Sequence, residues 1–113
     1  MKKTILKPVI TEDMRRLYNF FQKNSNTYCY VSISANSLAR IMGYKRKDIT
    51  TIIKSINNEK RFKNVIIGCN EGYYFIDKSN KKLAIRILLE KTNKCYSELE
   101  SIMFLKTKID SIS

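Results

Sequence analysis

Soon after the start of the chain, a helix-start signal is followed by apolar residues that recur at helical spacing. Thr11 is followed by the acids Glu12 and Asp13. A side-chain oxygen at such a position caps a free N–H group of a helix, and acids favour the positive end of the helix dipole. The apolar positions that follow are Met14, Leu17, Tyr18 and Phe21. The pattern predicts a helix that begins after Thr11 and stops near residues 23–27, where Asn and Ser favour a turn.

The next stretch, residues 28–33, is β-branched and aromatic and has the length of one short strand. Ser34 follows it and is expected to cap a second helix. The expected inward face of this helix consists of Leu38, Ile41 and Met42. Gly43 comes next, and glycine readily adopts the left-handed conformation that ends many helices. Because a helix running through Gly43 would be disfavoured by about 1 kcal/mol relative to alanine, we expect the helix to end there.

A third helix is expected after Gly43, starting in the polar run of residues 45–48. Its apolar face, at spacings of three and four, consists of Ile49, Ile52, Ile53 and Ile56. Its other face carries Lys47, Thr50, Thr51, Lys54 and Ser55. Residues 37–56 therefore predict two helices separated at Gly43, and the second combines a core face with a basic, hydroxyl-bearing face.

Two runs of β-branched and aromatic residues, 64–69 and 73–77, flank a short turn at residues 70–72. Gly72 stands where such a turn needs a positive φ, so the pattern predicts a β-hairpin. Tyr73, Tyr74 and Phe75 alternate across the second strand, and at least one ring is expected to point outward. We expect that ring to pack beneath a C-terminal helix rather than to stack on a base.

The C-terminal segment has no Gly or Pro from residue 81 to about residue 108, and its apolar residues keep a period of roughly 3.5 with lapses at Thr92 and Lys106. This pattern predicts one long helix, or two helices with a break at residues 92–94. The apolar stripe consists of Ile85, Leu88, Leu89, Tyr96, Leu99, Ile102, Met103 and Ile109. The stripe has two interpretations, docking beside the hairpin of the same chain or self-association in a coiled coil.

The chain has 113 residues, of which 43% are hydrophobic, and this predicts one folded core. We divide it into an N-terminal arm (1–10), a domain (11–77) and a C-terminal helical extension (78–113). Lys and Arg number 22 against 10 Asp and Glu, which gives a net charge of +12. Such an excess favours a polyanionic partner, most often nucleic acid, with a membrane surface as the second choice.

Several classes of function lack their usual sequence signals. No run reaches the ~20 apolar residues needed to cross a bilayer. Lys7 and Pro8 interrupt the apolar stretch at the start, so no secretory signal is expected and a cytoplasmic protein is predicted. Three widely spaced cysteines and the lack of histidine argue against a disulfide framework or a Cys/His zinc site. Without a phosphate-binding glycine loop or a catalytic carboxylate motif, we expect no enzyme activity, metal or cofactor.

The predicted elements follow the order helix, strand, helix, tight turn, helix and hairpin. In residues 38–44, Leu38 and Ile41 would pack inward, and Gly43 opens the turn before the apolar Tyr44. Residues 72–76, Gly-Tyr-Tyr-Phe-Ile, are similar to the glycine-aromatic return strand of many wings. The chain resembles the winged helix-turn-helix superfamily over residues 11–77, and its trailing helix is similar to one on small winged-helix proteins of phages and mobile elements of low-GC bacteria. The resemblance implies a mainly α fold with a small antiparallel β-hairpin (α+β), followed by a long C-terminal helix.

The resemblance also implies that the third helix enters the major groove of DNA. The residues that match its N-terminal and outward positions are Lys45, Arg46, Lys47, Thr50, Thr51 and Lys54. Lys or Arg can contact guanine, and a threonine methyl group can contact thymine. Candidate contacts to the DNA backbone are Ser34, Asn36, Ser37, Arg40, Lys60, Arg61 and Lys63. The hairpin tip carries Glu71 and no Lys or Arg lies between residues 64 and 77, so the hairpin is not expected to enter a minor groove.

The charge and the resemblance together predict a protein that binds double-stranded DNA, either a transcriptional regulator or a phage or mobile-element accessory in replication or recombination. A homodimer through the C-terminal helix would supply the two-fold symmetry that a palindromic site requires. The alternative is a winged helix that binds protein, such as a phage inhibitor of a host nucleic-acid enzyme, because winged helices also serve as protein-protein modules. The acidic hairpin tip and outward aromatic side chains support this alternative.

Overall fold

The computed structural model describes residues 9–94 and 99–112, so most of the expected N-terminal arm lies outside the described residues. The described chain is mainly helical with one two-stranded antiparallel sheet, which confirms the predicted mainly α fold with a small antiparallel β-hairpin (α+β). Its elements are α1 (Glu12–Lys23), α2 (Ser25–Tyr28), α3 (Ala35–Met42), α4 (Arg46–Asn58), β1 (Val65–Cys69), β2 (Gly72–Ile76), α5 (Lys81–Lys94) and α6 (Leu99–Asp110).

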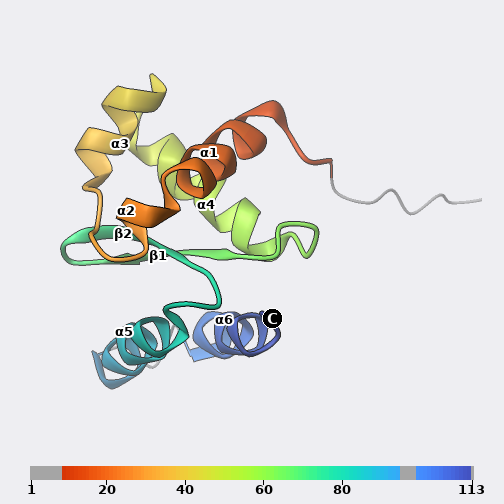
Figure 1. The fold of residues 1–113 in the computed structure, drawn as a ribbon, viewed down its shortest axis with the longest axis vertical. Helices are drawn as coiled ribbons and strands as arrows, with labels where there is room; N and C mark the ends of the chain where they lie inside the picture. Colours follow the sequence, from red (N-terminus) through yellow and green to blue (C-terminus); the bar gives the residue numbers. More distant parts are fainter. Residues whose placement is uncertain (1–8, 95–98, 113) are drawn as a thin grey trace, which may run out of the picture.

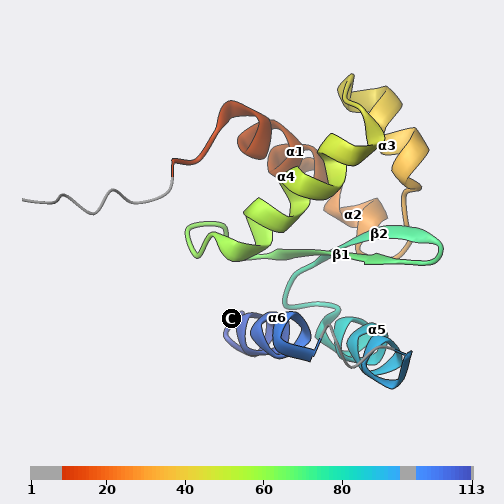
Figure 2. The same cartoon turned by 180° about the vertical axis from the view of Figure 1, so that it is seen from behind.

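The hairpin of β1 and β2 separates two helical layers. Helices α1 to α4 lie on one face of the hairpin, and α5 and α6 lie on the other (Figures 1 and 2). Because side chains alternate along a strand, Ile66 and Phe75 enter the core formed with α1, α3 and α4. Val65, Ile67 and Ile76 enter a second core formed with α5 and α6. The hairpin is therefore buried on both faces.

Three predicted helix boundaries are confirmed by the backbone. The Met14 N–H donates to Thr11 Oγ1 at 3.1 Å, and the Ser37 N–H donates to Ser34 Oγ at 3.1 Å, so both hydroxyl residues cap their helices. Gly43 has φ 75° and ends α3 in the left-handed conformation. Local capping chemistry thus sets the starts of α1 and α3 and the end of α3.

The strand predicted over residues 28–33 is wrong. Residues Ser25–Tyr28 form the short helix α2, and only Ile33 pairs, through an isolated antiparallel bridge to Tyr73. The N–H groups of Thr27 and Tyr28 both donate to the Asn24 carbonyl at 2.9 Å, and the Tyr28 ring packs 5.6 Å from the ring of Phe20. Helical turns and aromatic packing on α1 therefore override the β-branched character of this stretch.

The predicted inward face of α3 needs one correction. Leu38 and Met42 are buried, but Ile41 is 55% exposed and Ala39 is buried in its place. At 100° per residue, residues 38, 39 and 42 share one side of the helix, and residue 41 falls outside it. The larger side chain, Ile41, therefore faces solvent, and the smaller Ala39 faces the core.

The C-terminal segment forms two helices, and the link between them lies outside the described residues. Helices α5 and α6 lie side by side, and both cover the second face of the hairpin (Figures 1 and 2). Their buried side chains on this face are Ala84, Ile87, Leu88, Ile102 and Ile109, and Ile112, just after α6, joins them. Of the two interpretations of the apolar stripe, docking on the same chain is therefore observed. Tyr74 is half-buried against this second core, as expected for an aromatic ring beneath the C-terminal helices.

Gly72 allows the hairpin to lie against the chain segment before α3. Its φ of 139° is positive, as predicted for the glycine of this turn. A Cβ atom at this position would lie 2.3 Å from the Ile33 carbonyl oxygen. Glycine is therefore required both for the conformation of residue 72 and for the bridge between Ile33 and Tyr73.

Candidate nucleic-acid interface

Helix α4 has a buried isoleucine face and an exposed polar face. Ile49, Ile53 and Ile56 are buried, and Ile52 is half-buried, as their spacing predicts. The exposed residues at helical spacing on the opposite side are Lys47, Thr50, Thr51, Lys54 and Asn58. The structure thus brings four of the predicted base-contacting residues together on one accessible helix face.

The start of α4 carries two further predicted residues. Lys45 occupies the N-cap position without a side-chain capping bond, and Arg46 is exposed in the first turn. Free backbone N–H groups at a helix start add partial positive charge to these cations. This end of α4 is therefore favourable for a phosphate or for the electronegative edge of guanine.

The hairpin tip lies close to the starts of α3 and α4. Arg46 lines a shallow cavity of about 210 Å³ together with Ser34 and Asn36 of the α3 start and Asn70 and Glu71 of the tip. No local pattern in the chain predicts this proximity. It places the one carboxylate of the tip beside a cationic helix start.

Two hydroxyl groups of this region, those of Thr51 and Ser34, already donate hydrogen bonds. Thr51 Oγ1 donates to the Lys47 carbonyl at 3.2 Å, and Ser34 Oγ lies 2.9 Å from Ser37 Oγ. Thr51 therefore offers a partner its methyl group and oxygen lone pairs, which suit a thymine methyl or a base amino group. Ser37 is half-buried beside the α3 cap, whereas Arg40 is exposed on α3.

Arg61 is held by a neighbouring carboxylate. Its Nε atom donates to Glu59 Oε1 at 2.7 Å, and its Nη2 atom donates to Glu59 Oε2 at 3.2 Å. These hydrogen bonds lower the pKa of the Glu59 carboxyl to about 2. Arg61 is therefore a weaker candidate for a phosphate contact than its sequence position predicts, because a phosphate would have to compete with Glu59.

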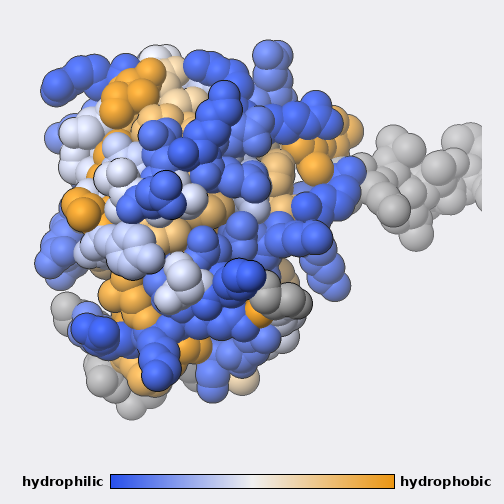
Figure 3. Space-filling model, viewed as in Figure 1, coloured by the Kyte–Doolittle hydropathy of each residue, from blue (hydrophilic) through white to orange (hydrophobic). Residues whose placement is uncertain are grey.

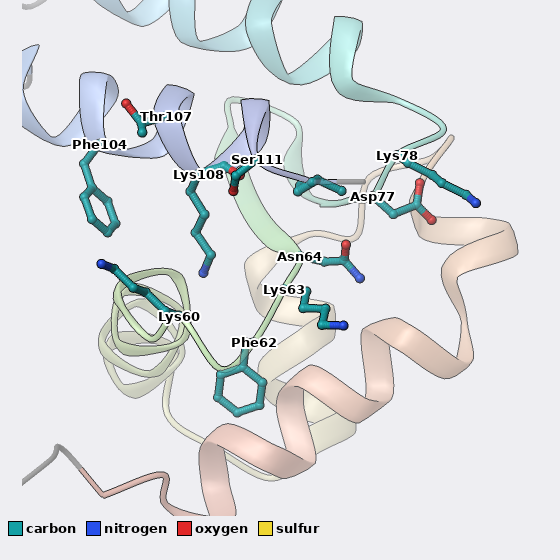
Figure 4. Close-up of a pocket in the computed structure, with 11 residues that line it drawn as sticks. Lys60, Phe62, Lys63, Asn64, Asp77, Lys78, Phe104, Thr107, Lys108 and Ser111 are labelled. Atoms are coloured by element: carbon teal, nitrogen blue, oxygen red, sulfur yellow. The ribbon is translucent and has the colours of Figure 1, made fainter.

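Lys60 and Lys63 lie at the opposite end of α4 from Lys45 and Arg46. Both are exposed and line a cavity of about 820 Å³ between the segment after α4 and helix α6 (Figure 4). Lys78 and Lys108 line the same cavity. Apart from Arg40 on α3 and the paired Arg61, the predicted basic residues therefore fall into two groups, one on the face and start of α4 and one around this cavity.

A hydrogen-bond network holds the turn between α3 and α4 against α1. Arg16 Nη1 donates to the Tyr44 hydroxyl at 2.7 Å, and that hydroxyl donates to Asp13 Oδ1 at 2.7 Å. Burial and the hydrogen bond to Asp13 raise the pKa of Tyr44. Asp13 was predicted only as a helix-start acid, and no local signal indicates partners so distant in the sequence.

Two polar contacts fix the end of α4. Lys108 Nζ, from α6, donates to the carbonyls of Asn57 at 2.8 Å and of Ile56 and Glu59 at 3.3 Å. The buried Asn57 amide donates to the Ile66 carbonyl at 2.8 Å and accepts from the Ile66 N–H at 2.9 Å. The first contact adds a cationic donor to the carbonyls at the end of α4, and the second joins α4 to β1. Sequence reasoning did not identify either residue.

Burial also changes the ionisation of Lys108. It lowers the pKa of the ammonium group from the 10.5 of an exposed lysine to about 8, and the Glu59 carboxylate acts in the opposite direction. The group is thus a cation near neutral pH, which suits its position at the negative end of the α4 dipole.

The described residues contain no group of three or more His, Cys, Asp or Glu side chains that could hold a metal ion. No helix in the described part of the chain is long and apolar enough to cross a membrane. Cys29 is buried, and its burial, with the nearby Asp77, raises the pKa of its thiol to about 11. This thiol is therefore a poor nucleophile.

The face of the molecule seen in Figure 3 is largely polar. Figure 3 shows hydrophilic residues over most of the face seen in Figure 1, with hydrophobic residues in scattered patches between them.

Comparisons with models of protein families, with curated proteins and with solved structures found no match to this chain. Its function is therefore inferred from the geometry and charge of these surfaces.

Proposed function

We propose that this chain is a winged helix-turn-helix protein that binds duplex DNA with α4 in the major groove. The observation that carries the proposal is the exposed face of Lys47, Thr50, Thr51 and Lys54 opposite the buried isoleucines of α4. In the cell the protein would act as a transcriptional regulator or a replication or recombination accessory of a phage or mobile element.

The order of elements supports this fold. Helix α1 precedes the Ile33 bridge, α3, the left-handed Gly43, α4 and the hairpin. A winged helix-turn-helix domain has a short strand between its first two main helices that pairs with the hairpin, and the Ile33 pairing to Tyr73 occupies that place in the order. The Arg16 and Tyr44 network and the Lys108 contact hold the two ends of α4, so its outer face is a rigid surface.

The chemistry of the α4 face suits DNA. Lys47 and Lys54 are seven residues apart, two helical turns, so both ammonium groups lie on the side that would face the groove. Lysines there neutralise phosphates or contact guanine, and the threonine methyl groups between them can contact thymine. The net charge of +12 supports a polyanionic partner.

The hairpin has a different role in this proposal. Its tip carries Glu71, whose Oε2 accepts from the Tyr74 hydroxyl at 3.3 Å, and both faces of its strands are buried. A carboxylate is repelled by phosphates, so we propose that the hairpin supports α4 and α6 and does not enter a minor groove.

The test is a duplex-binding titration with two double variants. Lys47→Ala/Lys54→Ala removes both cations from the α4 face, whereas Lys23→Ala/Lys82→Ala removes two exposed lysines of α1 and α5. We expect the first variant to bind a fluorescent duplex at least tenfold more weakly than the second at the same salt concentration. Equal affinities for the two variants would show that α4 does not contact the DNA.

A protein-binding role is the second candidate, and a specific surface favours it. Tyr30 is 68% exposed and Val31 is 58% exposed, next to each other in the segment after α2. Adjacent exposed apolar side chains are typical of protein contacts. Absence of duplex binding at low salt, with tight binding to a purified nucleic-acid enzyme that Tyr30→Ser/Val31→Ser abolishes, would favour this second function.

A further inference from the structure

The cavity between the segment after α4 and helix α6 has the size of a small-molecule site. Its volume of about 820 Å³ lies within the range of roughly 300–1,000 Å³ that is usual for such sites. Its walls come from the chain after α4, the chain after β2 and the last turns of α6 (Figure 4). The cavity lies away from the exposed face of α4, so it is not part of the proposed duplex-binding surface.

The charge in this cavity favours an anion. Four lysines line it against one carboxylate, Asp77, which already accepts hydrogen bonds from the Ser79 N–H and hydroxyl. Lys108 donates to the end of α4, but among the described residues neither Lys60 nor Lys63 makes a side-chain hydrogen bond or an ion pair. The ammonium group of each lysine is therefore available to an anion without loss of a protein contact, and the two side chains extend to opposite sides in Figure 4.

The α6 wall adds an aromatic ring and hydrogen-bond acceptors. Phe104 is 40% exposed, and Figure 4 shows the Lys60 side chain extending toward it. Thr107 Oγ1 donates to the Met103 carbonyl at 3.0 Å, and Ser111 Oγ donates to the Lys108 carbonyl at 2.7 Å. Because both hydroxyl protons are used, these oxygens can accept hydrogen bonds from a ligand.

We propose that this cavity binds a nucleotide. Lys60, which extends toward Phe104 in Figure 4, holds the phosphate, the base lies against Phe104, and a sugar hydroxyl or base amino group donates to Thr107 or Ser111. A fatty acid would supply the anion but no donors for the two hydroxyl oxygens, and inorganic phosphate would leave Phe104 without a partner. The same chemistry is available from a free mononucleotide and from the terminal nucleotide of a single strand.

The experiment is isothermal titration calorimetry of the full chain with the four ribonucleoside monophosphates, with inorganic phosphate and with a 5′-phosphorylated hexadeoxynucleotide. We expect at least one monophosphate to bind more tightly than inorganic phosphate. Lys60→Gln and Phe104→Ala should each weaken that binding about tenfold. Lys82→Gln, which removes an exposed lysine of α5, is the matched control and should bind as the unaltered protein does.

Thermal unfolding of each variant separates loss of the site from loss of the fold, and both altered side chains are accessible enough for the variants to stay folded. Binding of the hexanucleotide that is also weakened by Phe104→Ala would identify a strand end as a source of the ligand. The proposal is overturned if neither a monophosphate nor the hexanucleotide binds, or if both variants bind unchanged. Duplex binding by Lys47→Ala/Lys54→Ala is measured separately, so failure of the nucleotide site leaves the α4 proposal untouched.

Discussion

Single buried amides connect elements that the helical patterns treat as independent. Asn80 is 8% exposed and lies directly before α5. Its Nδ2 atom donates to the carbonyls of Cys29 and Phe75, both at 2.9 Å, and its Oδ1 atom accepts from the Asp77 N–H at 2.9 Å. One side chain thus satisfies backbone groups from the segment after α2, from β2 and from the connection to α5. Such residues hold the two helical layers to the hairpin.

Replacement of this amide should be costly. Asn80→Ala leaves three backbone groups without their partner in a buried site, so we expect the free energy of unfolding to fall by about 2–4 kcal/mol. Urea denaturation measures this change in the free energy of unfolding, and Asn19→Ala, on the exposed side of α1, is the control. The control should change stability by less than about 0.5 kcal/mol. Similar denaturation midpoints for the two variants would contradict the role of Asn80.

The two glycines with positive φ should respond differently to alanine. Gly43, with φ 75°, has no atom of its surroundings within 4 Å of the place a Cβ would take, so Gly43→Ala should cost only about 1–2 kcal/mol of left-handed strain. Gly72→Ala adds a clash with the Ile33 carbonyl and should cost more. Thermal denaturation of both variants tests the order, and the reverse order would show that the Ile33 bridge does not restrict residue 72.

At the scale of elements, the sequence predicted the helix boundaries and buried helix faces that capping residues and apolar spacing determine. Thr11, Ser34 and Gly43 marked helix boundaries, and the isoleucine spacing indicated the buried side of α4 and, with it, the exposed candidate face. Residues 28–33 and Ile41 were predicted wrongly because tertiary packing on α1 and the rotation of α3 decided them. The contacts of Lys108 with α4 join residues about fifty positions apart, and no spacing along the chain encodes them.

The contact between α6 and the end of α4 predicts a pH dependence of stability. The pKa of Lys108 is about 8 in the folded chain and near 10.5 when exposed, so between these pH values the unfolded chain binds the additional proton. The free energy of unfolding should therefore rise with pH in this window, relative to Lys108→Met, which has no titrating group there. The rise should stay below the ~1.4 kcal/mol per pH unit of full linkage, since the ammonium is partly solvated.

Urea denaturation of both proteins at several pH values from 7.5 to 10 provides the measurement. The difference between them is the relevant quantity, because Tyr44 and Tyr74 are present in both. A difference that stays constant with pH would contradict the burial of Lys108 at the end of α4.

At the scale of the whole molecule, the C-terminal helices form a structural layer. Ile109 of α6 is fully buried against the hairpin, whereas Met103 of the same helix is 60% exposed. Leu89 of α5 is also 60% exposed. The predicted homodimer therefore depends on these exposed residues, because the buried part of the apolar stripe is already covered by the hairpin.

Two substitutions separate the structural role of the α5 and α6 layer from a role in dimer formation. Ile109→Asp places an unpaired charge in the second core, so we expect loss of several kcal/mol of stability and, with it, the folded α5 and α6 layer. Met103→Asp should leave stability nearly unchanged, because that side chain contacts mainly solvent. Light scattering then measures the oligomeric state of each protein. If the unaltered protein is a dimer and Met103→Asp is a folded monomer, the dimer interface includes the surface around Met103. If the unaltered protein is a monomer, the dimer prediction is wrong.

The salt dependence of duplex binding tests the central claim, DNA contact by α4, most directly. The logarithm of the binding constant is measured against the logarithm of salt concentration for the unaltered protein and for Lys47→Ala/Lys54→Ala. The claim predicts a steep negative slope that becomes shallower in the variant, by about 0.9 for each of the two lysines that neutralises a phosphate. Identical slopes and affinities for the two proteins, or no duplex binding at low salt, would contradict it.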